Sequence, residues 1–283
     1  MRAMPVGPFV EHDPAWGDLR TWRAILSARH EYTPRYLLAA VDLERRAGGS
    51  IGPAPAEQRV HVQLLAQTLW ISLVVTLLCL AIGYPLAYTM ASLPGRWGAL
   101  LLVVVLLPFW TSALVRTAAW MVLLRKDGVI NTIFLALGVA AEPFELIFNR
   151  FSVYVAMVYV MLPFMVLPLY SAMRSIDPGQ VRAAESLGAR PPVAFFTVYL
   201  PQTAPGVSAG SILVFIQTLG FYVTPAPVGG RQDQMISMVI ANYALGTANW
   251  NMAAAVSVVL LVCIALVYPI FTRFAGTAPL GIR

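Results

Sequence analysis

Side chains that could carry out chemistry are scarce in the apolar part of this chain. The 3 histidines, His12, His30 and His61, all precede the first apolar run, where we expect them at the protein surface. No GxxxxGK[ST] phosphate-binding loop occurs, and neither a His/Glu metal pair nor a Ser-His-Asp set can be assembled in the apolar runs. Cys79 and Cys263 lie inside apolar runs without metal-ligand spacing, so we interpret both as packing residues. The sequence thus indicates no catalytic centre, metal site or cofactor of its own.

A few polar residues inside the apolar runs are candidates for a different role. A charge in a membrane is energetically expensive, and Arg116 interrupts an otherwise apolar run. It either faces a polar pathway or a partner subunit, or it is structural and reaches the outer headgroups or pairs with backbone carbonyls. Four neutral side chains near the end of a later run could line the same pathway or make helix–helix contacts. These are Gln217, Thr218, Tyr222 and Thr224.

A short helix with marks at both ends is predicted between two apolar runs. Asp177 suits the N-cap, and Pro178 suits the first helical position, where its missing N–H has no cost. Gly188 is placed to end the helix in a left-handed conformation. A second segment then returns to the membrane at Leu200 and Pro201. We expect a rigid helix that can contact a soluble partner, and an ordinary connecting loop is the alternative.

Composition identifies the elements that must position these residues. Hydrophobic residues make up 59% of the chain and charged residues only 11%, whereas soluble domains carry roughly 25% charged residues. A bilayer-crossing helix needs about 20 mostly apolar residues. The qualifying stretches are residues 68–91, 98–124, 151–173, 201–223 and 252–272. We therefore predict an all-α integral membrane protein, a polytopic helical bundle with these five spans.

The loop between the third and fourth spans carries a spaced motif. It reads Arg182-Ala183-Ala184, three residues, Gly188, nine residues, Val198, one residue and Leu200-Pro201. This spacing resembles the cytoplasmic signature of permeases of binding-protein-dependent ABC importers, which begins with Glu-Ala-Ala and has Ile in place of Val198. Arg182 stands where the signature has Glu, so the charge at the first position of the motif is reversed. Glu185, one turn later, partly replaces the missing acid.

Other stretches resemble the spermidine/putrescine branch of that family, the PotB-like permeases. They are Pro108-Phe109-Trp110-Thr111, Leu162-Pro163-Phe164-Met165, Pro168-Leu169-Tyr170, and Phe221-Tyr222-Val223-Thr224-Pro225 followed by Gly229-Gly230. The resemblance extends over residues 62–272. Those permeases have six spans with both termini inside, so it implies that the first span of the family type is missing upstream.

The resemblance also implies an orientation. The polar residues 1–62 are expected in the periplasm, residues 63–275 form the transmembrane permease domain with the coupling loop 174–200, and residues 276–283 form a cytoplasmic tail. Six basic residues then lie inside against four outside, a weak positive-inside bias. The inside set is Arg96, Arg174, Arg182, Arg190, Arg273 and Arg283, and the outside set is Arg125, Lys126, Arg150 and Arg231.

The function implied by the resemblance is that of a permease subunit of an ABC importer in the bacterial inner membrane. It would move a small polar solute, a polyamine by branch, through ATP-driven alternating access. The implied partners are two ATPase subunits that bind ATP and Mg, a second and different permease subunit, and a periplasmic substrate-binding protein. The implied ATPase-coupling residues are Asp177, Pro178, Arg182, Ala183, Ala184, Glu185, Gly188, Leu200 and Pro201.

Several alternatives stay open on the sequence. One is an ABC permease for another solute, such as an amino-acid derivative or an organic anion. A channel and a secondary transporter are further alternatives, although no Asp or Glu lies within any predicted span to form a proton relay. A membrane enzyme would need convergent ionisable residues near one membrane face, and we find none in the sequence.

Overall fold

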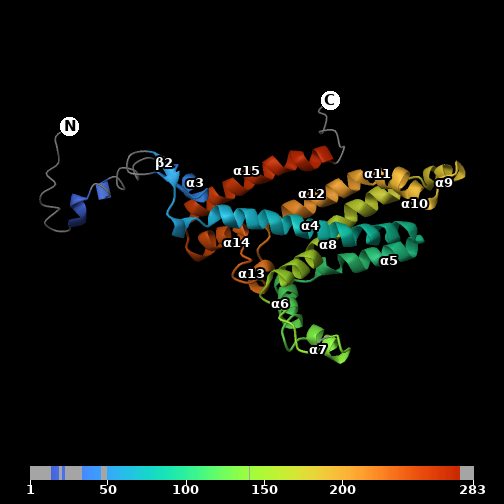
Figure 1. The fold of residues 1–283 in the computed structure, drawn as a ribbon, viewed down its shortest axis with the longest axis horizontal. Coiled ribbons are helices and arrows are strands. Elements are labelled where there is room, and N and C mark those ends of the chain that lie inside the picture. The colour runs from blue at the N-terminus through green and yellow to red at the C-terminus, as the bar shows by residue number, and fades with distance from the viewer. Residues whose placement is uncertain (1–13, 19–20, 23–33, 46–49, 140, 275–283) are drawn as a thin grey trace.

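The computed structural model describes residues 14–18, 21–22, 34–45, 50–139 and 141–274, and these are mostly helical (Figure 1). In chain order the elements are η1 (Pro14–Gly17), α3 (Arg35–Ala40), β1 (Leu43–Arg45), β2 (Ile51–Pro53), η2 (Ala56–Gln58), α4 (His61–Ser92), α5 (Gly95–Leu106), η3 (Leu107–Trp110), α6 (Ala113–Leu123), α7 (Val129–Ala136), α8 (Arg150–Ser175), α9 (Pro178–Ser186), α10 (Pro191–Ala194), η4 (Phe195–Tyr199), α11 (Leu200–Gln202), α12 (Ala204–Gly220), α13 (Pro225–Val228), α14 (Ile236–Ala241), η5 (Asn242–Gly246) and α15 (Trp250–Phe274). The predicted helical class is confirmed. The predicted tail 276–283 lies outside the described residues.

The long apolar helices correspond to the predicted spans. Three of them, α4, α8 and α15, are long and apolar enough to cross a membrane alone. Two further spans are possible if two consecutive helical segments are counted as one bent span. The first pair is α5–η3 with α6, bent by 97°, and the second is Pro191–Gln202 with α12, bent by 58°. The described part of the chain therefore holds three to five candidate spans, and they overlap all five predicted stretches.

The second predicted span, residues 98–124, is not one straight helix. Pro108 has no N–H to continue the helical ladder, and Thr111 and Ser112 are extended, with ψ of 142° and 138°. The segment Gly95–Trp110 is ~24 Å long at the α-helical rise, which is less than the ~30 Å hydrocarbon core. Hydropathy does not reveal this break, because a bend leaves the composition of the run unchanged.

The core of the bundle is the packing of α8 against α4 and α12. Along its buried face α8 places methionines at a four-residue spacing, Met157, Met161 and Met165. On the facing side of α12, Gly206 and Gly210 permit the backbones to approach. A Cβ on Gly206 would lie 2.6 Å from the Ala172 Cβ, and a Cβ on Gly210 would lie 2.9 Å from the Met165 Sδ. This small-residue contact, with glycines four apart, is typical of membrane helix pairs.

The segment that contains α3, β1 and β2 lies at the N-terminal end of α4, at the other end of the bundle from α9 (Figure 1). The Asp42 carboxylate accepts hydrogen bonds from the backbone N–H groups of His61 (3.1 Å) and Val62 (2.8 Å), and so caps α4. The His61 ring bridges Asp42 Oδ1 (3.0 Å from Nδ1) and Tyr243 Oη (3.1 Å from Nε2). Since His61 is buried, the prediction that it lies on the surface is wrong. The other two histidines fall outside the described residues.

A side arm, residues 111–149, projects from the bundle through α6 and α7 (Figure 1). Two hydrogen bonds join it to the segment around α13. The hydroxyl oxygens of Thr117 and Thr224 lie 3.2 Å apart, and the Phe148 N–H donates to the Val228 carbonyl at 2.9 Å. Within the arm, Lys126 Nζ lies 2.6 Å from Glu145 Oε1. The hydrogen bond from this ammonium group lowers the pKa of the exposed Glu145 carboxyl.

Candidate functional site

The predicted short helix is present as α9, and both of its predicted end signals are confirmed. The Asp177 side chain accepts a hydrogen bond from the Gly179 N–H at 2.8 Å, and Pro178 occupies the first helical position. Gly188 follows the helix with φ +94°. Its N–H donates to the Glu185 carbonyl at 2.9 Å, and the Ala189 N–H donates to the Ala184 carbonyl at 3.1 Å. This pair of bonds is a Schellman motif, which fixes the direction in which the chain leaves α9.

Most of the surface of α9 is exposed in the part of the chain that the structure describes. None of its residues is buried. Arg182, Ala183 and Glu185 are exposed, and Ala184 is half-buried. Leu187, immediately after the helix, is 90% exposed. A large apolar side chain held in water beside two small alanines is typical of a protein contact surface.

The second half of the motif joins α9 to the membrane helices. Leu200 is half-buried and Pro201 is exposed in α11, directly after the π-helix η4. The ring of Tyr199 meets the Tyr88 ring of α4 edge-on, with centroids 5.4 Å apart. Phe195 contacts both rings, with centroid distances of 5.8 Å to Tyr88 and 5.5 Å to Tyr199. The aromatic rings of η4, the segment that follows α9 and α10, therefore pack directly on α4.

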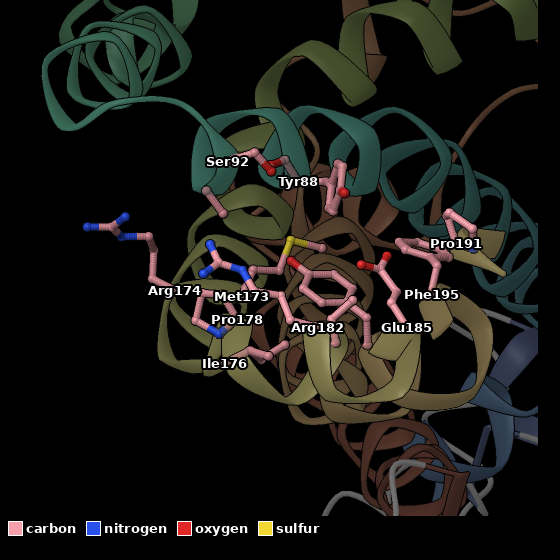
Figure 2. A pocket seen from close by; sticks show the side chains of 13 residues that line it. Tyr88, Ser92, Met173, Arg174, Ile176, Pro178, Arg182, Glu185, Pro191 and Phe195 are labelled. Atoms are coloured by element: carbon pink, nitrogen blue, oxygen red, sulfur yellow. The ribbon is translucent and has the colours of Figure 1, made fainter. Parts of the chain in front are cut away.

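A cavity of about 690 Å³ lies between α9 and the ends of α4 and α8 (Figure 2). Its walls include the aromatic rings just described together with Met173 of α8. Arg182 and Glu185 line it from α9. No sequence pattern indicates this cavity, because its walls come from four separate segments.

Arg116 is bound to backbone carbonyls at the bend between η3 and α6. Its Nη2 donates to the carbonyl of Pro108 and, at 2.8 Å, to that of Thr111. Its Nε also lies 3.3 Å from the Thr111 hydroxyl oxygen. These are the contacts of the structural interpretation, since the guanidinium adds hydrogen bonds to two backbone carbonyls at the break between η3 and α6. The pathway interpretation of Arg116 stays a prediction.

We expect Arg116→Gln to lower the stability of the purified protein by about 1–3 kcal/mol, because charged hydrogen bonds to the broken helix end are lost. Arg116→Lys should restore little, since an ammonium group lacks the planar fork that reaches two carbonyls. Thermal unfolding measures the stability, and uptake normalised to folded protein measures the function. An unchanged unfolding temperature with a changed KM for uptake would instead support the pathway role.

The four neutral pathway candidates differ in their exposure. Gln217 and Tyr222 are exposed, whereas Thr218 and Thr224 are buried. Thr224 is bonded to Thr117 of α6, and the Thr218 hydroxyl has no hydrogen-bond partner in the described structure. None of the four lines the cavity behind α9. Their role in a pathway stays a prediction.

Two further groups of residues were missed by the sequence analysis. One is the Asp42–His61–Tyr243 bridge, which joins positions far apart in the chain. The other is the ion pair of Arg150 Nε with Asp233 Oδ1 at 2.9 Å, in which Asp233 is buried. No local sequence pattern connects the residues of the bridge or the two residues of the ion pair. Only a contact between distant segments reveals them.

Known permeases match this chain over most of its length. This chain is 35% identical over 248 residues to the spermidine/putrescine transport system permease protein PotB of Haemophilus influenzae. The matched region covers 85% of this chain and 87% of that protein. It is 34% identical over 214 residues to PotB of Escherichia coli, covering 76% of this chain and 78% of that protein. The inner membrane ABC transporter permease protein YdcU of Escherichia coli is 35% identical over 231 residues, which cover 76% of this chain and 72% of YdcU.

The fold and the family model agree with these relatives. A chain in the crystal structure of a bacterial alginate ABC transporter, in complex with an alginate pentasaccharide-bound periplasmic protein, superposes with a TM-score of 0.63 at 15% identity. The superposition covers 96% of this chain and 99% of that one. Residues 80–276 match the model of the binding-protein-dependent transport system inner membrane component. Together with the apolar helices, this match places the chain in the bacterial inner membrane as a multi-pass protein. The chain therefore belongs to the family of binding-protein-dependent transport system inner membrane components, as a PotB-like permease of the ABC importer type.

Proposed function

We propose that this permease imports a polyamine, putrescine or spermidine, and that α9 couples it to ATP hydrolysis on separate subunits. The observation that carries the coupling is the exposed, doubly capped α9 between two membrane segments. The identity to PotB over most of both chains supports the substrate class. The chain itself supplies no phosphate-binding loop, so ATP and Mg would be bound by two partner ATPase subunits.

The coupling would work through connections at both ends of α9. Two residues, Ile176 and Asp177, separate α9 from α8, so a push on α9 acts directly on that span. Through η4 and α11 the same push reaches α12, and the aromatic rings carry it to α4. Ala183 and Ala184 are small enough to let α9 enter an ATPase groove. Arg182 replaces the acid usual at this point of the contact, with Glu185 as the nearby carboxylate.

Movement of these helices would alternate access between the two sides of the membrane. ATP binding on the ATPases biases that equilibrium by its differential affinity for the two states. A second permease subunit would complete the pathway, and a periplasmic substrate-binding protein would deliver the solute. We place residues 1–62 in the periplasm and the loop 174–200 with the tail 276–283 in the cytoplasm.

The environment of Arg116 is compatible with a cationic substrate. An unpaired Arg along the pathway would repel a polyamine, as like charges do in a low-dielectric site. Because its guanidinium is engaged by two backbone carbonyls at the bend, Arg116 has a structural role that needs no contact with the solute.

Transport by the assembled complex tests the proposal. The chain is co-expressed with its neighbouring subunits, reconstituted in proteoliposomes, and supplied with ATP, binding protein and labelled putrescine or spermidine. We expect ATP-dependent uptake that disappears when this chain is omitted. Binding-protein-stimulated ATPase activity without polyamine uptake would discard the polyamine and favour another small solute. Failure to associate with any ATPase would refute the coupling role.

A further inference from the structure

The carboxylate of Asp233 lies at the end of the bundle opposite α9, in the turn that follows α13. There α13 lies beside the start of α8 (Figure 1). The Val228 carbonyl of α13 accepts hydrogen bonds from the Phe148 N–H at 2.9 Å and from Ser152 Oγ at 2.6 Å. These bonds hold the turn with Asp233 against the first residues of α8. In the proposed function this end faces the periplasm, from which the solute arrives.

The partners of Asp233 set it apart from the other buried acid. In the described part of the chain, the buried carboxylates are those of Asp42 and Asp233. Asp42 is fixed by two backbone N–H groups at the start of α4. Asp233 Oδ1 instead lies 2.9 Å from Arg150 Nε, and its Oδ2 accepts a longer bond of 3.3 Å from the Gly230 N–H. The counter-charge of Asp233 is therefore a side chain, which can move away from it.

Arg150 is a partner that α8 itself does not need. It is the first residue of α8, where a cation is unfavourable beside the helix dipole, and the N-cap of the helix is supplied by Asn149. The side chain of Arg150 is 45% exposed, whereas that of Asp233 is 7% exposed. The guanidinium can thus turn into water, but the carboxylate left behind would be a buried charge without a partner, which is strongly destabilising. Asp233 can release Arg150 only if another cation takes its place.

We propose that Asp233 receives an ammonium group of the polyamine as the solute enters the permease, and that this cation displaces Arg150. A primary ammonium group has three N–H donors and the same charge as the guanidinium, so the exchange keeps the buried carboxylate paired. The assignment rests on the proposed function, which supplies both the polyamine and the periplasmic orientation of this end. A neutral or anionic solute has no cation to leave at Asp233, so the exchange also selects the substrate class.

Equilibrium binding to the assembled complex tests the exchange. The purified complex, with its ATPases and without the binding protein, is titrated with labelled spermidine. Asp233→Asn should weaken binding about 10- to 100-fold, because a charged hydrogen bond to the ligand is lost. Arg150→Gln should tighten binding about two- to fivefold, because the competing half-exposed cation is gone. A pair that only holds the structure together would make both variants bind more weakly, so the opposite signs distinguish the two roles.

Thermal unfolding with and without spermidine gives a second readout. Spermidine should raise the unfolding temperature of Arg150→Gln more than that of the unmodified complex, because the ligand supplies the missing counter-charge and tighter binding stabilises more. It should not stabilise Asp233→Asn. Should Arg150→Gln fail to fold, Arg150→Lys takes its place, since lysine retains the charge but not the planar fork of the guanidinium. That variant should bind spermidine at least as tightly as the unmodified complex.

The matched control is Arg231→Gln, which removes an exposed cation two residues from Asp233. The ion pair of Asp233 is with Arg150, so Arg231→Gln should change binding less than twofold. Weaker binding by both Arg150→Gln and Asp233→Asn, or an Arg231→Gln gain as large as that of Arg150→Gln, would overturn the exchange. A complex that imports polyamine but whose spermidine binding is unchanged by Asp233→Asn refutes this site alone. An unmodified complex that neither binds nor imports polyamine refutes the proposed substrate, and the site with it.

Discussion

Import is expected to fall about 5- to 30-fold when Gly188 is replaced by valine, while membrane insertion stays intact. Gly188 has φ +94°, and a Cβ built there would meet no atom within 4 Å, so the cost comes from the backbone alone. A left-handed conformation costs a residue with a Cβ roughly 1–2 kcal/mol, and β-branching adds to this. A bias of that size shifts the population of correctly directed α9 by the stated factor. ATPase activity should then continue without matched uptake.

A matched control for this variant is available in the same chain. Gly138 ends α7 in the side arm with φ +68°, the same Schellman pattern of hydrogen bonds and no atom within 4 Å of a built Cβ. Gly138→Val therefore introduces the same backbone strain far from α9. Gly188→Asn should retain most transport, since Asn tolerates the left-handed region. If Gly188→Val imports as well as the unmodified chain, or if Gly138→Val uncouples equally, the coupling role of α9 is wrong.

Gly206→Ala is expected to destabilise the bundle by about 1–3 kcal/mol, the usual cost of overpacking. The added Cβ would lie 2.6 Å from the Ala172 Cβ and 2.9 Å from the Pro168 carbonyl oxygen. A backbone carbonyl cannot move aside as a flexible side chain can, so α8 and α12 would have to separate. Gly206→Val should be worse, with a loss of folded protein. Thermal unfolding of purified protein measures the effect, at about 2–4 °C per kcal/mol for chains of this size.

The control for this second variant lies on the same helix. Gly220 ends α12, and a Cβ built on it would meet no atom within 4 Å. Gly220→Ala should leave the unfolding temperature unchanged or slightly raised, because alanine reduces the entropy of the unfolded chain. An unfolding temperature for Gly206→Ala equal to that of the unmodified chain would mean that α8 and α12 do not approach so closely in the membrane.

Local signals in the sequence determined much of the architecture. Runs of apolar residues indicated the membrane helices, because the cost of burying polar groups in lipid acts on composition alone. Asp177, Pro178 and Gly188 indicated both ends of α9, since capping involves only neighbouring residues. The spacing of the motif after Arg182 indicated the family before any contact was known.

Tertiary packing decided the rest. The burial of His61, between Asp42 and Tyr243, depends on which segments meet in space. The close approach at Gly206 depends on a partner helix more than 30 positions away, Ala172 being its nearest contact. The cavity with Arg182 and Glu185 exists only because α4, α8, α9 and η4 converge. Capping and hydropathy act over a few residues and can be read from the chain, whereas packing acts between residues that the sequence keeps apart.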